Sequence, residues 1–203
     1  MLRIFRYILI ICQFTTAVSK GQVAPMLTRG PENGHLVIAG GNLRDTSVFN
    51  LFIRLAGGHE ASVVIIPTAA DDGFFEGDSA LIMLERRYNR LGLQNITILH
   101  TRDPREADEK AFAEPITKAR AVWFPGGRQW RLADSYLNTL THRELNNLLS
   151  RGGVIGGSSA GATIQGSFLA RGDTTYLMPA DSKEFYFLRR GQRYDMRTRT
   201  VIR

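Results

Sequence analysis

The sequence predicts an α/β fold in which helices cover both faces of a parallel sheet. Short apolar runs alternate along the 203 residues with longer segments whose apolar residues recur at helical spacing. Most of these runs end in glycine, proline or small polar residues, which is typical of buried strands followed by tight turns. Alternation of this kind predicts a parallel sheet between two layers of helices. The expected strands are 36–41, 62–67, 95–100, 121–124 and 153–157.

The segments between these strands carry helix start and stop signals. Paired glycines end the first segment, one glycine ends the second, and a capping box begins the last. The segment 103–118 is charged and only partly helical in pattern. The positions expected to face inward are Val48, Leu51, Phe52 and Leu55, then Leu81, Leu84, Tyr88 and Leu91, then Leu145, Leu148 and Leu149 after the capping box Thr141–Glu144.

Composition and the N-terminal pattern divide the chain into four regions. With 43% hydrophobic and 22% charged residues, the body has the composition of one globular domain. Residues 1–19 have a basic start, a short apolar run and small residues, the pattern of a signal peptide too short to span a bilayer. Residues 20–34 are a linker, 35–188 form the α/β domain, and 189–203 are a basic, divergent or truncated tail. We therefore expect an exported protein, periplasmic or extracellular, with no membrane segment after cleavage.

The only cysteine, Cys12, lies within the expected signal peptide. Cleavage after Ser19 leaves a mature protein without cysteine, which suits an oxidising compartment because a core of this size needs no disulfide. The alternative is a lipid anchor on Cys12. Against it, Ile10 and Ile11 are not the small residues expected before such an anchor.

The net charge of +7 comes from the ends of the chain. Residues 20–188 carry 18 basic and 18 acidic side chains, whereas the last 15 residues hold six arginines and one acid. The neutral body gives no reason to expect a nucleic-acid partner. The tail has two interpretations, a solvated segment or one that binds an acidic polymer or anionic lipid.

Ser159 is the candidate nucleophile. Gly157–Gly161 have the spacing of a nucleophile elbow, in which two glycines flank a serine in a strained strand-to-helix turn. Such a turn aims the backbone N–H of Ala160, and the positive end of the helix, at an oxyanion forming beside the hydroxyl. The alternative is an ordinary Gly/Ser turn between a strand and a helix.

The ends of the other four predicted strands are also rich in glycine and polar residues. In parallel α/β sheets, sites lie beyond the carboxyl ends of the strands, so these ends would meet Ser159 at one rim. Each end alone is a common turn sequence. Together they predict a shared site, formed by Gly40–Asn42, Pro67–Ala69, His100–Arg102 and Gly126–Gln129.

Four segments follow one another in a distinctive order and spacing, namely Gly40–Asn42, Ile66–Ala69, Trp123–Gln129 and Gly156–Ala162. Together they resemble the cyanophycinase and dipeptidase E family of serine peptidases, over about residues 35–172. The resemblance implies the class I glutamine-amidotransferase-like fold, a three-layer αβα sandwich around a mostly parallel sheet. It also implies hydrolysis of aspartyl or β-aspartyl peptide bonds. Amidotransferases with this fold use cysteine at the elbow, so the serine here excludes thiol chemistry.

The resemblance further implies roles for individual residues. Backbone donors at fixed positions stabilise a tetrahedral intermediate, one donor being worth about 3 kcal/mol in a comparable site. The implied partner is a peptide substrate, aspartyl-arginyl peptides included, with a homodimer as one candidate assembly. No cofactor is implied, and no metal, since no His, Cys, Asp or Glu group has ligand spacing. The implied roles are nucleophile for Ser159, oxyanion hole for Gly127 and Ala160, and substrate binding for Gly126, Arg128 and Gln129.

The sequence departs from the family pattern at the general base. A serine nucleophile needs a base, in this family a histidine about forty residues later, and no histidine follows Ser159 in the sequence. Asp195 stands where the aspartate of that motif would, but Arg197 takes the histidine's place and stays protonated. Of the four histidines, His100 alone is expected at the functional rim, where we favour a positioning or structural role over that of a substitute base. The others, His35, His59 and His142, are expected at the surface of the opposite rim.

Two functions therefore stay open at the level of sequence. One is a serine peptidase of cyanophycinase type that acts through Ser159, its reading frame truncated or divergent. The other is a catalytically impaired relative that binds aspartyl peptides without efficient turnover. A periplasmic binding module unrelated to peptidases is disfavoured by the matching segments.

Overall fold

The computed structural model describes residues 30–76, 79–166, 169, 193–195 and 200–202. Its centre is a five-stranded sheet in the order β1-β5-β4-β2-β3, in which every neighbouring pair of strands is parallel. The expected α/β fold class is confirmed. The bounds are β1 His35–Ala39, β2 Ser62–Ile65, β3 Asn95–Ile98, β4 Ala121–Phe124 and β5 Val154–Ser158.

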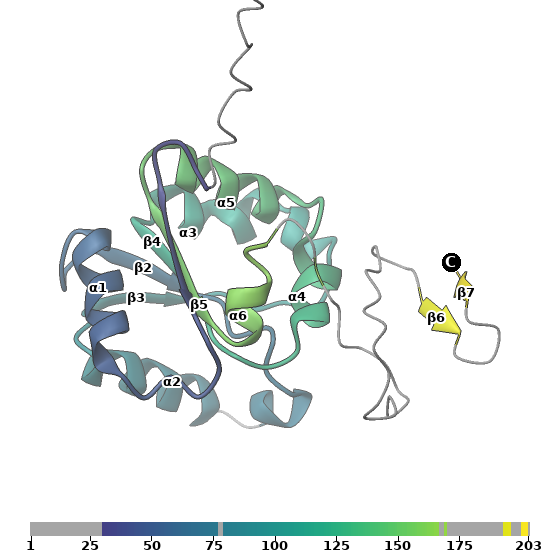
Figure 1. The fold of residues 1–203 in the computed structure, drawn as a ribbon, viewed down its shortest axis with the longest axis horizontal. Coiled ribbons are helices and arrows are strands. Elements are labelled where there is room, and N and C mark those ends of the chain that lie inside the picture. The colour runs from purple at the N-terminus through teal and green to yellow at the C-terminus, as the bar shows by residue number, and fades with distance from the viewer. Residues whose placement is uncertain (1–29, 77–78, 167–168, 170–192, 196–199, 203) are drawn as a thin grey trace, which may run out of the picture.

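Helices cover both faces of this sheet (Figure 1). On one face, α1 (Thr46–Ala56) and α2 (Ser79–Arg90) pack over a cluster of buried apolar side chains. A second cluster lies under the helices of the other face. That face carries α3 (Lys110–Lys118), α4 (Gln129–Tyr136), α5 (Leu140–Ser150) and α6 (Ala160–Thr163), with the 3-10 turns η1 (Asp72–Phe75) and η2 (Glu106–Asp108) among the connections.

The C-terminal strands form a separate sheet. β6 (Arg193–Asp195) and β7 (Thr200–Ile202) pair antiparallel. Asp195, the candidate for the motif aspartate, is thus the last residue of β6, whereas Arg197 lies outside the described residues. The expected signal peptide, most of the expected linker and Cys12 also lie outside them. Within the described part of the chain, no helix has the length and apolar character needed to cross a membrane.

The core on the α1 side is built around the ring of Trp123 on β4. Phe49 and Phe52 of α1 meet this ring edge-on, with ring centroids 5.0 and 4.9 Å away. The ring of Tyr88 lies against Phe49 from α2, at 5.7 Å. These contacts fix α1 and α2 over β4, one strand away from the elbow strand β5.

The inward face of α1 differs from the predicted one. Phe49, Ile53 and Ala56 are buried beside Phe52, whereas Leu51 is 41% exposed. Apolar residues occupy most of this helix, so periodicity alone fits several faces, and the aromatic packing on Trp123 selects one. In α2, Leu84 and Tyr88 are buried as predicted but Leu81 is 45% exposed. Val48, Leu55 and Leu91 are half-buried against the same cluster.

The start of α5 also differs from the prediction. The helix begins at Leu140, capped by Thr139, whose side chain accepts a hydrogen bond from the N–H of His142 at 3.4 Å. Thr141 is therefore inside the helix, and its buried hydroxyl donates to the carbonyl of Ala107 at 2.7 Å. Two threonines compete for the cap in this sequence, and the tertiary bond to Ala107 decides between them. Leu145 and Leu148 are buried as predicted, and Leu149 is partly buried.

Candidate active site

Ser159 lies between the end of β5 and the first residue of α6, with φ 54° and ψ −117°. Such angles are strained for a residue with a side chain and persist only where the surroundings enforce them. Hydrogen bonds do so on both sides: the Ser159 N–H donates to the carbonyl of Ala39 at 3.1 Å, and its carbonyl accepts from Ala162 at 2.9 Å and Thr163 at 3.0 Å. The serine is therefore held by the end of β1 as well as by α6.

The two glycines of the elbow allow a close approach to β4. A Cβ on Gly161 would collide with the carbonyl oxygen of Phe124, and one on Gly157 with the carbonyl oxygen of Gly161. The backbone of α6 thus rests directly on the end of β4, with no space for side chains between them. The glycine spacing in the sequence reflects this packing.

Backbone without side chains flanks Ser159 on two sides. A Cβ on Gly126 would lie 3.2 Å from the Cβ of Ser159, and one on Gly41 would lie 3.7 Å from its Oγ. The loops after β1 and β4 therefore approach the serine closely, as their glycine-rich sequences predict. Among the described residues, the Ser159 hydroxyl has no hydrogen-bond partner, and it faces a pocket.

The two residues expected to form an oxyanion hole, Gly127 and Ala160, are not among the residues that line the pocket. Ala160 is the first residue of α6, so its N–H has no partner within the helix. Gly127 has φ 143°, and a Cβ there would collide with the carbonyl of Ala69. The next N–H, that of Arg128, donates to this carbonyl at 2.7 Å and so tethers the loop to the end of β2. The Gly127 and Ala160 N–H groups have no acceptor in the part of the chain that the structure describes.

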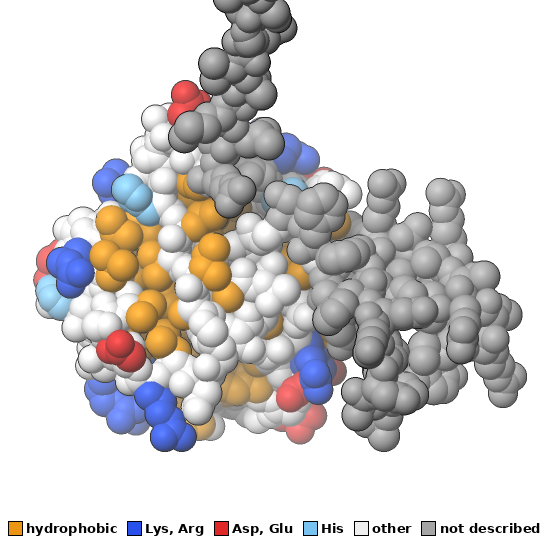
Figure 2. All heavy atoms as spheres, viewed as in Figure 1, with side chains coloured by type: hydrophobic (Ala, Val, Ile, Leu, Met, Phe, Trp, Pro, Cys, Tyr) orange, Lys and Arg blue, Asp and Glu red, His pale blue; other side chains and the backbone are white. Residues whose placement is uncertain are grey.

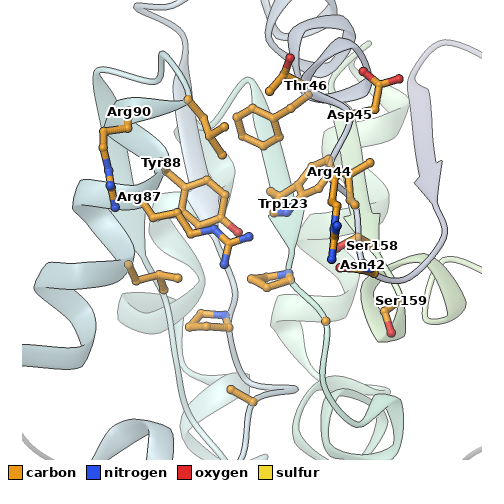
Figure 3. A pocket seen from close by; sticks show the side chains of 18 of the residues that line it. Asn42, Arg44, Asp45, Thr46, Arg87, Tyr88, Arg90, Trp123, Ser158 and Ser159 are labelled. Carbon is orange, nitrogen blue, oxygen red and sulfur yellow. The ribbon is translucent and has the colours of Figure 1, made fainter.

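The pocket that contains Ser159 has a volume of about 710 Å³ (Figure 3). It extends from the ends of β4 and β5 to α2, across the face that α1 and α2 cover. Ser158, Ser159 and Gly126 line one end, and Arg87, Tyr88 and Arg90 of α2 line the other. Further lining residues are Asn42, Arg44 and Asp45 after β1, Phe74 of η1, and Phe49 and Trp123 of the core.

Of the three residues predicted to bind substrate, one lines this pocket. Gly126 does so, and a side chain at this position would crowd Ser159. Arg128 is the exposed cap residue of α4, and Gln129 is its half-buried first residue. Neither belongs to the residues that line the pocket. The loop after β4 therefore meets the pocket through its glycine.

His100 is bonded on a different side of the rim. Its Nδ1 lies 2.9 Å from the hydroxyl of Thr68, and its ring stacks on Phe75 with centroids 3.7 Å apart. The Thr68 hydroxyl also lies 2.6 Å from the hydroxyl of Tyr136, whose pKa burial raises to about 12. Burial lowers the pKa of His100, and so does the positive charge of Arg102. These contacts give His100 a structural position, and it does not line the pocket of Ser159.

Of the other histidines, His35 and His59 are exposed as predicted, whereas His142 is half-buried. His35 is the first residue of β1. His59 precedes β2, with its Nδ1 2.7 Å from the carbonyl oxygen of Gly92. His142, in the first turn of α5, accepts a hydrogen bond from the N–H of Asn138 at 3.3 Å. None of the three lines the pocket. Within the described residues, no group of three or more His, Cys, Asp or Glu side chains is placed to hold a metal ion.

Two arginines hold the segment that follows β2. Arg131 donates to the carbonyl oxygen of Ala70 at 2.5 Å, and Arg102 donates to the same oxygen at 2.7 Å. Arg131 also pairs with Asp71 at 2.7 Å, and Arg102 with Asp72 at 2.9 Å. This segment leads directly into η1, which contributes Phe74 to the pocket wall. The arginines thereby fix one edge of the pocket.

The sequence did not indicate the arginines of the pocket. The only sequence feature that could have indicated a site residue among them is the position of Arg44, which follows the end of a predicted strand. Arg87 and Arg90 lie on the exposed side of an amphipathic helix, where charged residues are usual. Their position beside the pocket depends on how α2 packs on the sheet through Leu84 and Tyr88.

Comparison with known proteins gives these features a family context. The family model for Peptidase family S51 matches residues 35–185. The cyanophycinase of Geminocystis herdmanii is 27% identical over 143 residues, which cover 69% of this chain and 51% of that protein. The cyanophycinase of Thermosynechococcus vestitus is 26% identical over 156 residues, which cover 70% and 47%. The chain thus spans about half the length of the curated relatives it matches.

A solved structure shares the fold. The crystal structure of a peptidase from an acI-B1 Actinobacterium matches with a TM-score of 0.53 and 24% identity, covering 66% of this chain and 57% of that one. At this identity the likeness concerns the fold alone. The family match confirms the family resemblance inferred from the four sequence segments, and this structure agrees with the fold that the resemblance implies.

Proposed function

Because this chain belongs to peptidase family S51, we propose that it is a serine-type peptidase that hydrolyses aspartyl or β-aspartyl peptide bonds through Ser159. The observation that carries the proposal is the geometry of Ser159. Its positive φ turns the side chain away from β5 and into the pocket, between two glycine-containing loops. A catalytic serine at a nucleophile elbow has this strained geometry.

In the proposed reaction, the Ser159 hydroxyl attacks the carbonyl carbon of the substrate and loses its proton to a base. The Gly127 and Ala160 N–H groups donate to the resulting oxyanion. As the intermediate collapses, the C–N bond breaks, the base returns its proton to the departing amine, and an acyl ester remains on Ser159. Water then hydrolyses this ester. The cyanophycinase relatives support the aspartyl substrate class, at 26% and 27% identity.

A second candidate function is peptide binding with very slow turnover. It is favoured by the position of His100, which is bonded to Thr68 and stacked on Phe75. Within the described residues, no histidine lines the pocket together with Ser159. General base catalysis contributes about 10²- to 10⁴-fold to the rate, so its loss would leave binding with little hydrolysis.

Hydrolysis of β-aspartyl-arginine and of aspartyl dipeptides by the purified protein separates the two functions. We expect turnover that disappears in Ser159→Ala and persists in Ser150→Ala, a control in which the exposed serine lies on α5. A covalent adduct on Ser159, found by mass spectrometry after brief incubation with substrate, would support the nucleophile directly. Equal rates for the protein and Ser159→Ala, with peptide binding retained, would refute peptidase activity and leave the binding function.

A further inference from the structure

The pocket beside Ser159 is basic among its described residues. Arg44, Arg87 and Arg90 line it, against one carboxylate, that of Asp45. Asp45 is already engaged, because it caps α1 by accepting a hydrogen bond from the N–H of Ser47 at 2.8 Å, and this bond lowers its pKa. The excess of positive charge in the pocket is therefore not neutralised by its own lining.

None of these arginines forms an ion pair with another described residue. Arg90 donates from Nε to the backbone carbonyl of Arg86 at 3.4 Å, which leaves its charge uncompensated. The side chains of Arg44 and Arg87 form no hydrogen bond with the described residues. In Figure 3, the Arg44 side chain lies beside Ser158 and Asn42, while Arg87 extends from α2 across Tyr88 toward the pocket. Figure 2 shows basic side chains grouped along the same end of the molecule, over α2.

The floor of the pocket is aromatic and neutral. Trp123 and Tyr88 are buried there, and burial raises the pKa of the Tyr88 hydroxyl, which keeps it protonated. A ligand suited to this arrangement has an uncharged backbone that covers the floor and carboxylates that reach the guanidinium groups. Guanidinium groups bind carboxylates with directed, charge-assisted hydrogen bonds, and repel a second cation.

We propose that this pocket binds an acidic peptide segment with at least two carboxylates, one held by Arg44 near Ser159 and one by Arg87 and Arg90 on α2. The inference rests on the proposed function and narrows it: the acidic part of the substrate occupies this pocket, and arginyl side chains are excluded from it. Acidic oligopeptides are then better ligands than peptides that present a basic side chain to α2. Because all three guanidinium groups are exposed, they also attract acidic peptides from solution in a salt-dependent manner.

Calorimetric titration of the full chain carrying Ser159→Ala tests this inference without any need for turnover. The peptides are tri-aspartate, trialanine and trilysine. We expect tri-aspartate to bind at least about tenfold more tightly than either of the others. Arg44→Gln and Arg87→Gln should each weaken tri-aspartate binding by about three- to tenfold, as expected for partly exposed charge-assisted contacts.

Arg86→Gln is the matched control, since Arg86 is an exposed arginine of the same helix that does not line the pocket. We expect it to change the affinity less than about twofold, because Arg90 bonds only the backbone of Arg86. Equal affinity for tri-aspartate and trialanine, or equal losses in Arg86→Gln and Arg87→Gln, would overturn the inference. Hydrolysis of aspartyl peptides with an affinity insensitive to Arg44 and Arg87 would overturn it too, while the proposed function would stand.

Discussion

The hydroxyl of Thr68 lies 2.9 Å from Nδ1 of His100, and this contact joins the ends of β2 and β3. Thr68 is fully buried and also bonded to Tyr136 of α4. Burial lowers the pKa of His100, with a further lowering from Arg102, while Glu106 and Asp72 act in the opposite direction. The folded protein therefore favours the neutral imidazole.

We expect the free energy of unfolding to fall as the pH drops below the ordinary histidine pKa of about 6.5. Because His100 binds a proton more weakly in the folded than in the unfolded chain, its contribution is complete above that pH and is lost as the pH falls through the folded pKa. His100→Asn keeps a polar atom near the Nδ1 position but does not titrate, so its stability should depend less on pH. Urea unfolding at a series of pH values from 8 to 5 measures the free energy of unfolding of both proteins.

His142, whose pKa burial also lowers, is present in both proteins and therefore cancels in the comparison. Parallel pH profiles would show that His100 titrates alike in the folded and unfolded states, against this prediction.

Ser159→Gly should be more stable than Ser159→Ala. Both variants lose the hydroxyl, but only glycine adopts φ 54° and ψ −117° without strain. Glycine relieves about 1–3 kcal/mol of backbone strain, which exceeds the cost of the entropy that it adds to the unfolded chain. We therefore expect the free energies of unfolding of the two variants to differ by about 1 kcal/mol. Chemical denaturation of the two variants measures it. An alanine variant that is equally stable would mean that the turn stores no strain.

Gly161→Ala should destabilise the domain strongly. The new Cβ would collide with the carbonyl oxygen of Phe124, and this oxygen cannot move aside easily because it belongs to the backbone at the end of β4. We expect a loss of about 3 kcal/mol, at the upper end for overpacked sites. Gly40→Ala is the control, since a Cβ there meets nothing within 4 Å. Thermal unfolding of both variants should separate them clearly, and similar midpoints would contradict the close packing of α6 on β4.

Arg131→Met should cost more stability than Asp71→Asn. Arg131 is 11% exposed and bonds the carbonyl of Ala70, whereas its partner Asp71 is 83% exposed. Because solvent screens the ion pair, its contribution to the free energy of unfolding is less than about 1 kcal/mol. Loss of a buried hydrogen bond from a guanidinium group to a carbonyl costs about 2 kcal/mol. Urea unfolding of both variants makes the comparison. Equal losses would assign the stabilisation to the ion pair instead.

Local sequence was sufficient to predict the positions of the five strands of the central sheet, because each apolar run has a clear end. The run Leu36–Gly41 identified β1, and the glycines after Val154 and Ile155 identified the elbow. The strands are shorter than predicted where the runs continue into the rim, as at Ile66 after β2. Ile66 is still buried and its N–H still donates to the carbonyl of Trp123 on β4 at 3.0 Å, although the regular strand has ended.

Features that depend on packing between distant segments were less predictable. The prediction that Leu51 faces inward was wrong. The packing of aromatic rings of α1 against Trp123, and not the helical period, selects the buried side of this helix. Similarly, Ser159 and Gly126 were predicted from motifs, whereas Arg87 was not, because its place beside the pocket follows from the docking of α2. No local pattern encodes that docking.

The pairing of β1 with β5 has a consequence for biosynthesis. In the sheet, β5 lies between β1 and β4, so among the described strands β1 has no pairing partner until β5 has been made. On the ribosome, β1 is synthesised first and stays unpaired with β5 while β2, β3 and β4 are being made. Contacts this distant along the chain form slowly. Ser159 follows β5 and is bonded to Ala39 at the end of β1, so the turn at Ser159 is completed only when β5, the last described strand of this sheet along the chain, pairs with β1. A nascent chain that ends before β5 therefore lacks the candidate nucleophile and its support.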